Sequence, residues 1–283
     1  MPRRSTSYRP SFAVTAIVAA WLLLVPFDLM LTVTGMAINS ILFSKEDSGK
    51  LSDSQQSSLV IFLHGRLEAE PGETAYPPPN KLYADFIERL RKKLPSDGTA
   101  LLLLEFDEIL SKLSAEPRDL RLGPISSAIS ESICNVIAPE TSQQHKKTLT
   151  LVTFSMGAAM GLKLLNAGFS ERIEKVVLIE PVWRCWLPFA VSSPKIICDV
   201  PTLALAGSKD KDTMVDSGRS VQRSLKPFLP NLEVVELKGG NHWCILNDEF
   251  IISKEGLAPN KTPGELQNEM VENIACFCDW DDQ

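Results

Sequence analysis

The sequence predicts an α/β fold built on a mainly parallel sheet of about six strands with helices on both faces. Short, continuously apolar and β-branched runs recur after residue 57, and stretches with helical spacing of apolar residues fall between them. Continuous apolar runs are typical of strands that are covered on both faces. Strands that alternate with helices imply right-handed crossovers, and therefore parallel neighbours in one sheet.

Six runs predict the strands of this sheet. They lie at residues 58–63, 100–106, 148–154, 175–179, 202–206 and 232–237. Five intervening stretches predict helices, at residues 81–94, 124–136, 156–167, 212–225 and 264–274. In the first of these helices, Leu82, Phe86 and Leu90 fall close to one stripe with basic residues opposite, which is the pattern of a helix packed on a core.

Length and composition limit the classes of protein. The 283 residues are enough for one large domain with a short appendage, and the hydrophobic share of 44% is that of a globular chain and not of a disordered or fibrous one. The formal net charge of -6 gives no reason to expect a nucleic acid or an anionic membrane surface as a partner.

Residues 1–43 differ from the rest of the chain. Three arginines precede the first acidic residue, Asp28, and an apolar run fills residues 12–25. This run is short for a membrane span, which needs about 20 residues, and extending it would place the Asp28 carboxylate at membrane depth. A basic start followed by an apolar run predicts a targeting or anchor segment.

Three interpretations of this segment stay open. The first is a signal-anchor or signal peptide, with residues 35–37 (Gly-Met-Ala) as the cleavage candidate, and it predicts a membrane-associated protein or one of the secretory pathway. The second is an organelle transit peptide. The third is a pair of helices packed on the domain. Under the first two interpretations the chain divides into an N-terminal segment, 1–43, and a domain, 44–283.

Chemically capable residues follow four of the predicted strands. Residues 64–66 (His-Gly-Arg) follow the first strand, Ser155 the third, Asp210 the fifth and His242 the sixth. Ligands of parallel sheets bind at the carboxyl ends of the strands. The sequence therefore predicts a site at which a turn, a hydroxyl, a carboxylate and an imidazole meet.

Ser155 and His242 predict nucleophilic catalysis. A serine hydroxyl is a weak nucleophile until a neighbouring base takes its proton, and the start of a helix directs N–H groups towards a developing oxyanion. Of the three histidines, His145 lies in a polar run and His64 lies in the first turn, where a structural role fits it better. His242 is therefore the expected base, and the alternative for Ser155 is a helix N-cap.

These separated motifs, taken in their order along the chain, resemble the α/β-hydrolase family over about residues 57–280. The resemblance implies an α/β-hydrolase fold and a triad of Ser155 as nucleophile, Asp210 as acid and His242 as base. It also implies an oxyanion hole formed by the backbone N–H groups of Arg66 and Met156. Neither a cofactor nor a metal is implied.

The resemblance leaves two points open. Thr153 stands where the family most often has glycine, two residues before the nucleophile, and this could tighten the turn or shift the following helix. The acid is ambiguous as well, because Asp212 lies two residues beyond Asp210 and Glu180 follows the fourth strand, where some members of the family carry their acid.

A short lid is expected at residues 182–200, where the family inserts its cap. Its aromatic residues Trp183, Trp186 and Phe189 could line a pocket for an acyl or aryl group, or could simply pack on the edge of the sheet.

The expected function is hydrolysis of a carboxylic ester or thioester, from a small molecule or a lipid, through an acyl-enzyme. Two alternatives remain open. In the first, a hydrolase-like scaffold with a silent triad serves in binding or membrane tethering. In the second, the acyl group is transferred to an alcohol or a lipid instead of water.

Overall fold

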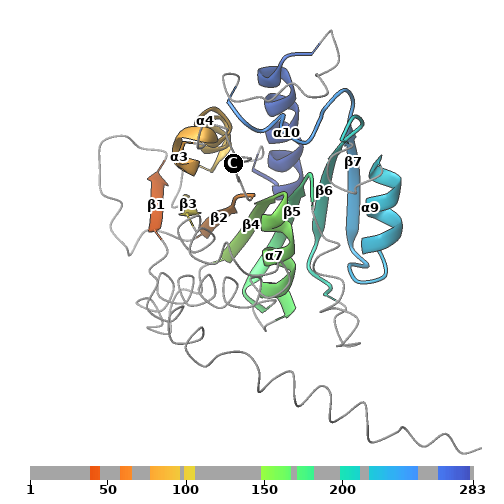
Figure 1. The fold of residues 1–283 in the computed structure, drawn as a ribbon. Coiled ribbons are helices and arrows are strands. Elements are labelled where there is room, and N and C mark those ends of the chain that lie inside the picture. The colour runs from red at the N-terminus through yellow and green to blue at the C-terminus, as the bar shows by residue number, and fades with distance from the viewer. Residues whose placement is uncertain are drawn as a thin grey trace, which may run out of the picture. The chain divides into compact units, whose positions relative to one another are not determined.

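The computed structural model of the chain describes nine stretches, namely residues 39–44, 58–65, 77–95, 99–105, 148–166, 171–181, 198–210, 217–247 and 261–280. They contain a seven-stranded sheet of order β1-β3-β2-β4-β5-β6-β7, which runs across Figure 1 from β1 to β7. The strands are β1 Asn39–Ser44, β2 Ser58–Leu63, β3 Thr99–Glu105, β4 Thr148–Phe154, β5 Ile173–Ile179, β6 Thr202–Gly207 and β7 Leu232–Leu237.

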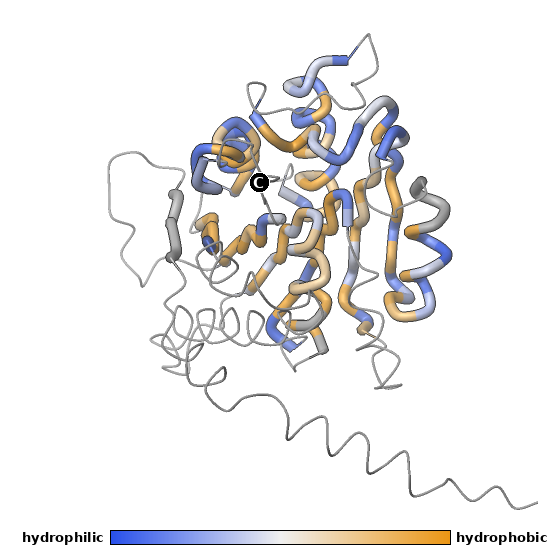
Figure 2. The backbone as a smooth tube through the Cα atoms, viewed as in Figure 1, coloured by the Kyte–Doolittle hydropathy of each residue, from blue (hydrophilic) through white to orange (hydrophobic). Residues whose placement is uncertain are grey.

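The predicted parallel sheet is confirmed. Strands β2 to β7 pair in parallel, and β2, β4 and β7 have the predicted bounds. The other three predicted strands differ from the observed ones by one or two residues at an end. Figure 2 shows hydrophobic residues along most of the length of the central strands, as strands buried on both faces require.

Strand β1 was not predicted. It pairs antiparallel with β3, from Asn39 opposite Glu105 to Ser44 opposite Ala100, although the sequence analysis assigned residues 39–43 to the N-terminal segment. The pairing gives hydrogen-bond partners to an edge of β3 that would otherwise present unpaired backbone groups. The rest of the predicted segment lies outside the described residues, so its targeting role and the division at residue 43 stay predictions.

Five helices accompany the sheet in the described stretches. They are α3 Pro79–Leu82, α4 Ala84–Lys93, α7 Met156–Asn166, α9 Ser217–Leu225 and α10 Pro263–Cys278. The predicted helix 81–94 starts two residues earlier and is divided at Tyr83, and α10 runs four residues past its predicted end. The predicted helix 124–136 lies outside the described residues. No helix in the described part of the chain is both long enough and apolar enough to span a membrane.

Helices cover both faces of the sheet, as predicted. Alternate strand residues such as Val152 and Phe154 join the buried side chains of α4 and α10 in one hydrophobic cluster. Thr153, on the opposite face of β4, lies against Gly161 of α7. Successive side chains of a strand point to opposite faces, so α7 lies on the face away from α4 and α10.

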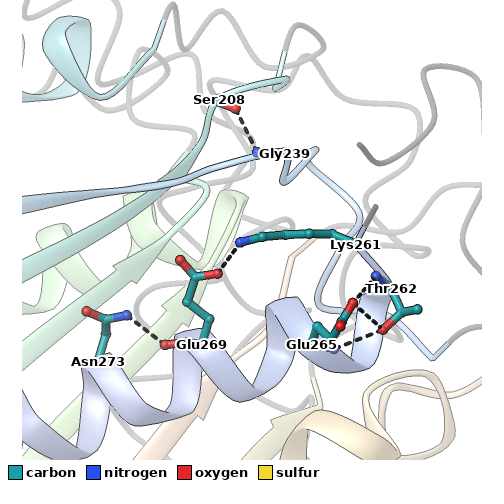
Figure 3. Close-up of polar contacts among 7 residues, drawn as sticks. All are labelled: Ser208, Gly239, Lys261, Thr262, Glu265, Glu269 and Asn273. Atoms are coloured by element: carbon teal, nitrogen blue, oxygen red, sulfur yellow. Dashed lines mark hydrogen bonds and ion pairs between the residues drawn. The ribbon is translucent and has the colours of Figure 1, made fainter. Parts of the chain in front are cut away.

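Helix α10 has well-defined ends. Figure 3 shows the capping box at its start, in which the Thr262 side chain accepts a hydrogen bond from Glu265 N and the Glu265 carboxylate accepts one from Thr262 N. Pro263 occupies the first helical turn, where its missing N–H costs nothing, and Asp279 ends the helix in the left-handed region at φ 57°. The helix therefore presents its buried face to the core in a defined register.

The loop 241–247 after β7 is held by helices at two points. The buried Gln267 of α10 donates its amide to the carbonyl of Leu246 at 2.8 Å. Asn247 donates its amide to Lys81 O at 2.8 Å and accepts from Asp85 N at 3.0 Å, which ties the loop to α3 and α4. The loop that carries His242 is therefore fixed from both sides.

We expect Asn247→Ala to lower the free energy of unfolding by about 1–3 kcal/mol, because it removes both side-chain hydrogen bonds to the helices. Urea unfolding followed by circular dichroism measures this change. Asn268→Ala, which removes an exposed contact with Arg89 on the same side of the molecule, is the matched control and should change stability by about 0.5 kcal/mol or less. Equal losses in the two variants would contradict a special role of Asn247.

Candidate active site

Ser155 lies on a tight turn between β4 and α7. Its backbone has φ 51°, in the left-handed region that non-glycine residues rarely adopt, and its N–H donates to Ile179 O at 3.0 Å. Two residues on, a Cβ at Gly157 would lie 2.2 Å from Leu63 O, so only glycine allows the helix to start this close to β2. Strain of this kind persists at functional sites because the surrounding structure enforces it.

His242 bridges Ser155 and Asp210. Its Nε2 lies 3.0 Å from Ser155 Oγ and its Nδ1 lies 3.1 Å from Asp210 Oδ2, and all three residues are buried. A carboxylate can only accept, so Nδ1 carries the proton and Nε2 is left to accept from the serine hydroxyl. The Ser155 side chain therefore faces a base, and the structure brings together the three residues predicted to form the triad.

The turns that carry Asp210 and His242 are joined directly. Ser208 accepts a hydrogen bond from Gly239 N at 2.8 Å, drawn in Figure 3, and Lys209 N donates to Gly240 O at 2.9 Å. A Cβ at Gly207 would meet Gly240 O at 2.4 Å, so the two strand ends approach as closely as backbones can. This contact sets the distance between the carboxylate and the imidazole.

Two aromatic rings hold the imidazole. The Phe154 ring lies 5.2 Å from the His242 ring between centroids, and the Trp243 ring meets it edge-on at 4.8 Å. Asn241 accepts a hydrogen bond from Trp243 N at 3.0 Å and so shapes the turn. These contacts restrict the orientation of the ring and exclude water from it.

Glu180, the alternative acid, lies next to the triad without forming part of it. It follows β5 with φ 41°, its side chain is fully buried, and its Oε1 accepts from Gly207 N at 2.7 Å. Burial raises the pKa of Glu180 well above its usual range, and the negative charge of Asp210 adds to this effect. The hydrogen bond from Gly207 N–H opposes it and lowers the pKa. The hydrogen bond that His242 Nδ1–H donates is accepted by Asp210. Asp212 lies outside the described residues.

One half of the predicted oxyanion hole is described. Met156 is the first residue of α7, where a backbone N–H has no partner within its own helix. Arg66 lies outside the described residues. The residue before it, Gly65, lies so close to Ser155 that a Cβ on it would be 2.8 Å from Ser155 Cβ, so the turn after β2 packs against Ser155.

Thr153, the departure from the family pattern, fits its position. Its hydroxyl donates to Val177 O on β5 at 3.0 Å, so the buried oxygen is satisfied. Its methyl faces Gly161 of α7, where a Cβ would lie 2.9 Å from Thr153 Cγ2. The volume added on the strand is thus matched by a glycine on the helix, and the contact between Ser155 and His242 is retained at 3.0 Å.

His64 has a structural position, as predicted. It is completely buried, and its Nδ1 lies 2.7 Å from Gly65 O, which requires a proton on that nitrogen. Burial lowers the pKa of His64 from its ordinary value of 6.5 to about 4, although the Gly65 carbonyl and the Glu105 charge oppose the shift. The imidazole is therefore neutral at pH 7 and supports the turn after β2.

The predicted pocket residues Trp183, Trp186 and Phe189 lie outside the described residues, as does most of the predicted lid. In the described stretches one group of three residues has metal-ligand chemistry, namely Glu180, Asp210 and His242, whose ligand atoms lie within 4.8 Å of one another. Both nitrogens of His242 are already engaged, one by Ser155 and one by Asp210. The geometry of this group is therefore that of a hydrogen-bonded triad with an adjoining carboxyl group.

A double-mutant cycle tests the match between Thr153 and Gly161. Gly161→Ala should destabilise the protein by about 1–3 kcal/mol, because the added methyl overpacks the Thr153 methyl. In a Thr153→Ser background, which keeps the hydroxyl and removes the methyl, the same substitution should cost nothing measurable. Urea unfolding of the four proteins gives the coupling, and an equal cost in both backgrounds would contradict the packing argument.

The lowered pKa of His64 predicts a loss of stability in acid. The contribution of neutral His64 to the free energy of unfolding is fully present above pH 6.5 and is lost as the pH falls towards 4. In this range the imidazole binds a proton in the unfolded chain but not in the folded protein, where it is buried. Between those limits the wild type should lose about 3 kcal/mol relative to His64→Asn, which keeps a donor for Gly65 O and does not titrate. Urea midpoints from pH 7 to pH 4 measure this, and parallel curves would contradict it.

No protein-family model matches the sequence, and no curated protein matches it. Solved structures do match. Alpha/beta hydrolase domain-containing protein 10 from mouse is 14% identical with a TM-score of 0.52, over 87% of this chain and 96% of that one. Est1E from Butyrivibrio proteoclasticus is 12% identical with a TM-score of 0.51, over 87% and 95%. Esterase PE8 is 14% identical with a TM-score of 0.51, over 86% and 99%. These structural similarities and the observed strand order both indicate the same fold, so the chain has the α/β-hydrolase fold.

Proposed function

We propose that this protein is a serine hydrolase that cleaves a carboxylic ester or thioester through an acyl-enzyme. The observation that carries the proposal is the buried chain of contacts from Ser155 Oγ to His242 Nε2, 3.0 Å, and from His242 Nδ1 to Asp210 Oδ2, 3.1 Å. A serine N-cap would need its oxygen to accept from the helix backbone. Here the hydroxyl is aligned to lose its proton to an imidazole.

The first half of the reaction forms the acyl-enzyme. Ser155 Oγ attacks the substrate carbonyl carbon while its proton passes to His242 Nε2, and the carbonyl electron pair moves onto the oxygen. The backbone N–H groups of Met156 and, by the family resemblance, Arg66 stabilise that oxyanion. When the tetrahedral intermediate collapses, the bond to the leaving group breaks and His242 returns the proton to the departing oxygen or sulfur.

The second half repeats these steps with water. His242 takes a proton from water, the hydroxide oxygen adds to the acyl carbon, and collapse returns the proton to Ser155 Oγ as the acid leaves. Asp210 keeps the imidazole in the tautomer with its proton on Nδ1 and stabilises the imidazolium that forms twice per cycle. It acts strongly because the site is buried, where electrostatic interactions are less screened than in water.

The substrate class is supported by the structural neighbours. PE8 is named as an esterase, and one structure of Est1E, with a TM-score of 0.51 to this chain, has ferulic acid bound. A bromoperoxidase from Bacillus anthracis has the same fold with a TM-score of 0.50, so fold alone does not choose the reaction. An apolar or aromatic acyl group is our choice, because Trp183, Trp186 and Phe189 are expected to border the site.

A silent triad would be favoured if Thr153 distorted the turn that carries Ser155. Thr153 is instead accommodated by Gly161, without loss of the contact between Ser155 and His242. Transfer of the acyl group to an alcohol instead of water uses the same triad and the same first half-reaction. Products formed in the presence of an added alcohol would distinguish it from hydrolysis.

Reaction with a fluorophosphonate probe tests the proposal, because only an activated serine is labelled. The protein tested has to include Asn39–Ser44, since a protein that began at residue 45 would lack strand β1. The wild type should be labelled, whereas Ser155→Ala should not be labelled at all. His242→Ala and Asp210→Asn should each slow labelling by about 10³- to 10⁴-fold.

Ser58→Ala is the matched control, because Ser58 lies at the opposite end of β2 and its hydroxyl contacts Thr99. It should be labelled at the rate of the wild type. A folded wild type that is not labelled would refute the enzyme proposal and leave the scaffold in its place.

A further inference from the structure

Glu180 is a buried acid that the proposed reaction does not use. Its side chain is fully buried beside the triad, and Oε1 accepts the N–H of Gly207 at 2.7 Å. Oε2 is buried too, and no N–H or O–H donor of the described residues reaches it. An oxygen that is buried without a donor is costly as part of a carboxylate and is satisfied if it carries a proton and donates itself.

The groups that face Glu180 come from two neighbouring strand ends. Asp210 follows β6, and an oxygen of its carboxyl group lies within 4.8 Å of an oxygen of the Glu180 carboxyl group. His242 and Cys244 follow β7, with a ligand nitrogen of His242 within 4.8 Å of both carboxyl groups and Cys244 Sγ 4.0 Å from Glu180 Oε1. Two carboxyl groups this close together and this deeply buried ionise together only at a high cost, so we expect the pair to hold one proton.

That proton belongs on Glu180. Asp210 receives the Nδ1–H of His242 and has to be negative when the imidazolium forms. From the described residues, Glu180 receives a neutral backbone N–H and the weak thiol donor of Cys244. Burial and the Asp210 charge both raise the pKa of Glu180, in agreement with this assignment.

We propose that Glu180 is a neutral carboxylic acid that donates a hydrogen bond to Asp210 and so positions this carboxylate against His242. Glu180 is then a positioning residue, which acts through Asp210, and the inference rests on the proposed function of the triad. The neutral state matters because a second negative charge this close would favour the imidazolium, so less of the imidazole would be free to take the serine proton and the proton would be returned less readily. At 4.8 Å and at the effective dielectric constant of buried sites, such a charge would change the affinity of the imidazole for its proton by more than tenfold.

Two substitutions separate a neutral Glu180 from an ionised one. Glu180→Gln keeps an oxygen for Gly207 N–H and offers an amide donor to Asp210, so labelling by the fluorophosphonate should stay within about threefold of the wild type. Glu180→Met has a similar length and keeps neither bond, so labelling should slow by about ten- to a hundredfold. If Glu180→Gln slows labelling as much as Glu180→Met does, the proposal is wrong.

The pH dependence of labelling gives a readout that a merely structural role would not change. The acid limb, where the base takes up a proton, should have the same midpoint in wild type and Glu180→Gln, because a neutral side chain replaces a neutral one. If Glu180 were ionised, the substitution would remove a negative charge and move the midpoint down by one pH unit or more, which would overturn the proposal.

Infrared difference spectra test the proton itself and need no catalytic activity. The spectrum of wild type minus Glu180→Gln at pH 7 should contain the carbonyl stretch of a protonated carboxylic acid, and this band should shift in D₂O. Its absence from a folded protein would overturn the proposal. Because this measurement does not depend on labelling, an inactive protein that shows the band would refute the proposed function and leave the protonation of Glu180 standing.

Discussion

The closeness of four backbone segments at the carboxyl edge of the sheet is the constraint on which the site depends. The carbonyl of Leu63 lies so close to Gly157, and that of Gly240 so close to Gly207, that a side chain at either glycine would collide with it. Because the strands are parallel and in register, their ends meet at this edge. These contacts hold Ser155 in a strained backbone conformation. Its side chain thereby contacts the imidazole of His242, which follows β7.

Burial then decides which groups carry charge. Four titratable residues are buried at the carboxyl ends of the strands, namely His64, Glu180, Asp210 and His242. An unpaired charge is energetically costly in such an environment. His64 responds by remaining neutral, and Glu180 shows the corresponding shift for an acid. Asp210 differs because the Nδ1–H of His242 compensates its charge. The environment therefore assigns different roles to two carboxyl groups that have similar chemistry.

The sequence predicted the sheet and much of the site for the same reason. Strands that are buried on both faces need apolar residues along their length, so β2 and β6 are visible as continuous runs, and the candidate site residues follow β2, β4, β6 and β7. Strand β1 escaped prediction because its six residues continue an apolar stretch that resembles a targeting segment. Its partner is β3, more than fifty residues away, and a long-range pairing of this kind leaves no local pattern.

The sequence by itself determined which residues to propose as nucleophile and base, because few serines stand between a buried strand and a helix and only three histidines exist. It could not choose between Asp210 and Glu180, since both follow a strand and both are acidic. Only the tertiary structure decided that Asp210 is the one hydrogen-bonded to His242, through the approach of Gly207 to Gly240 that brings the turn of Asp210 to the turn of His242. The same holds for Thr153, whose methyl is acceptable because Gly161 lies opposite. Contacts between distant segments are set by packing, and packing is not encoded at any single position.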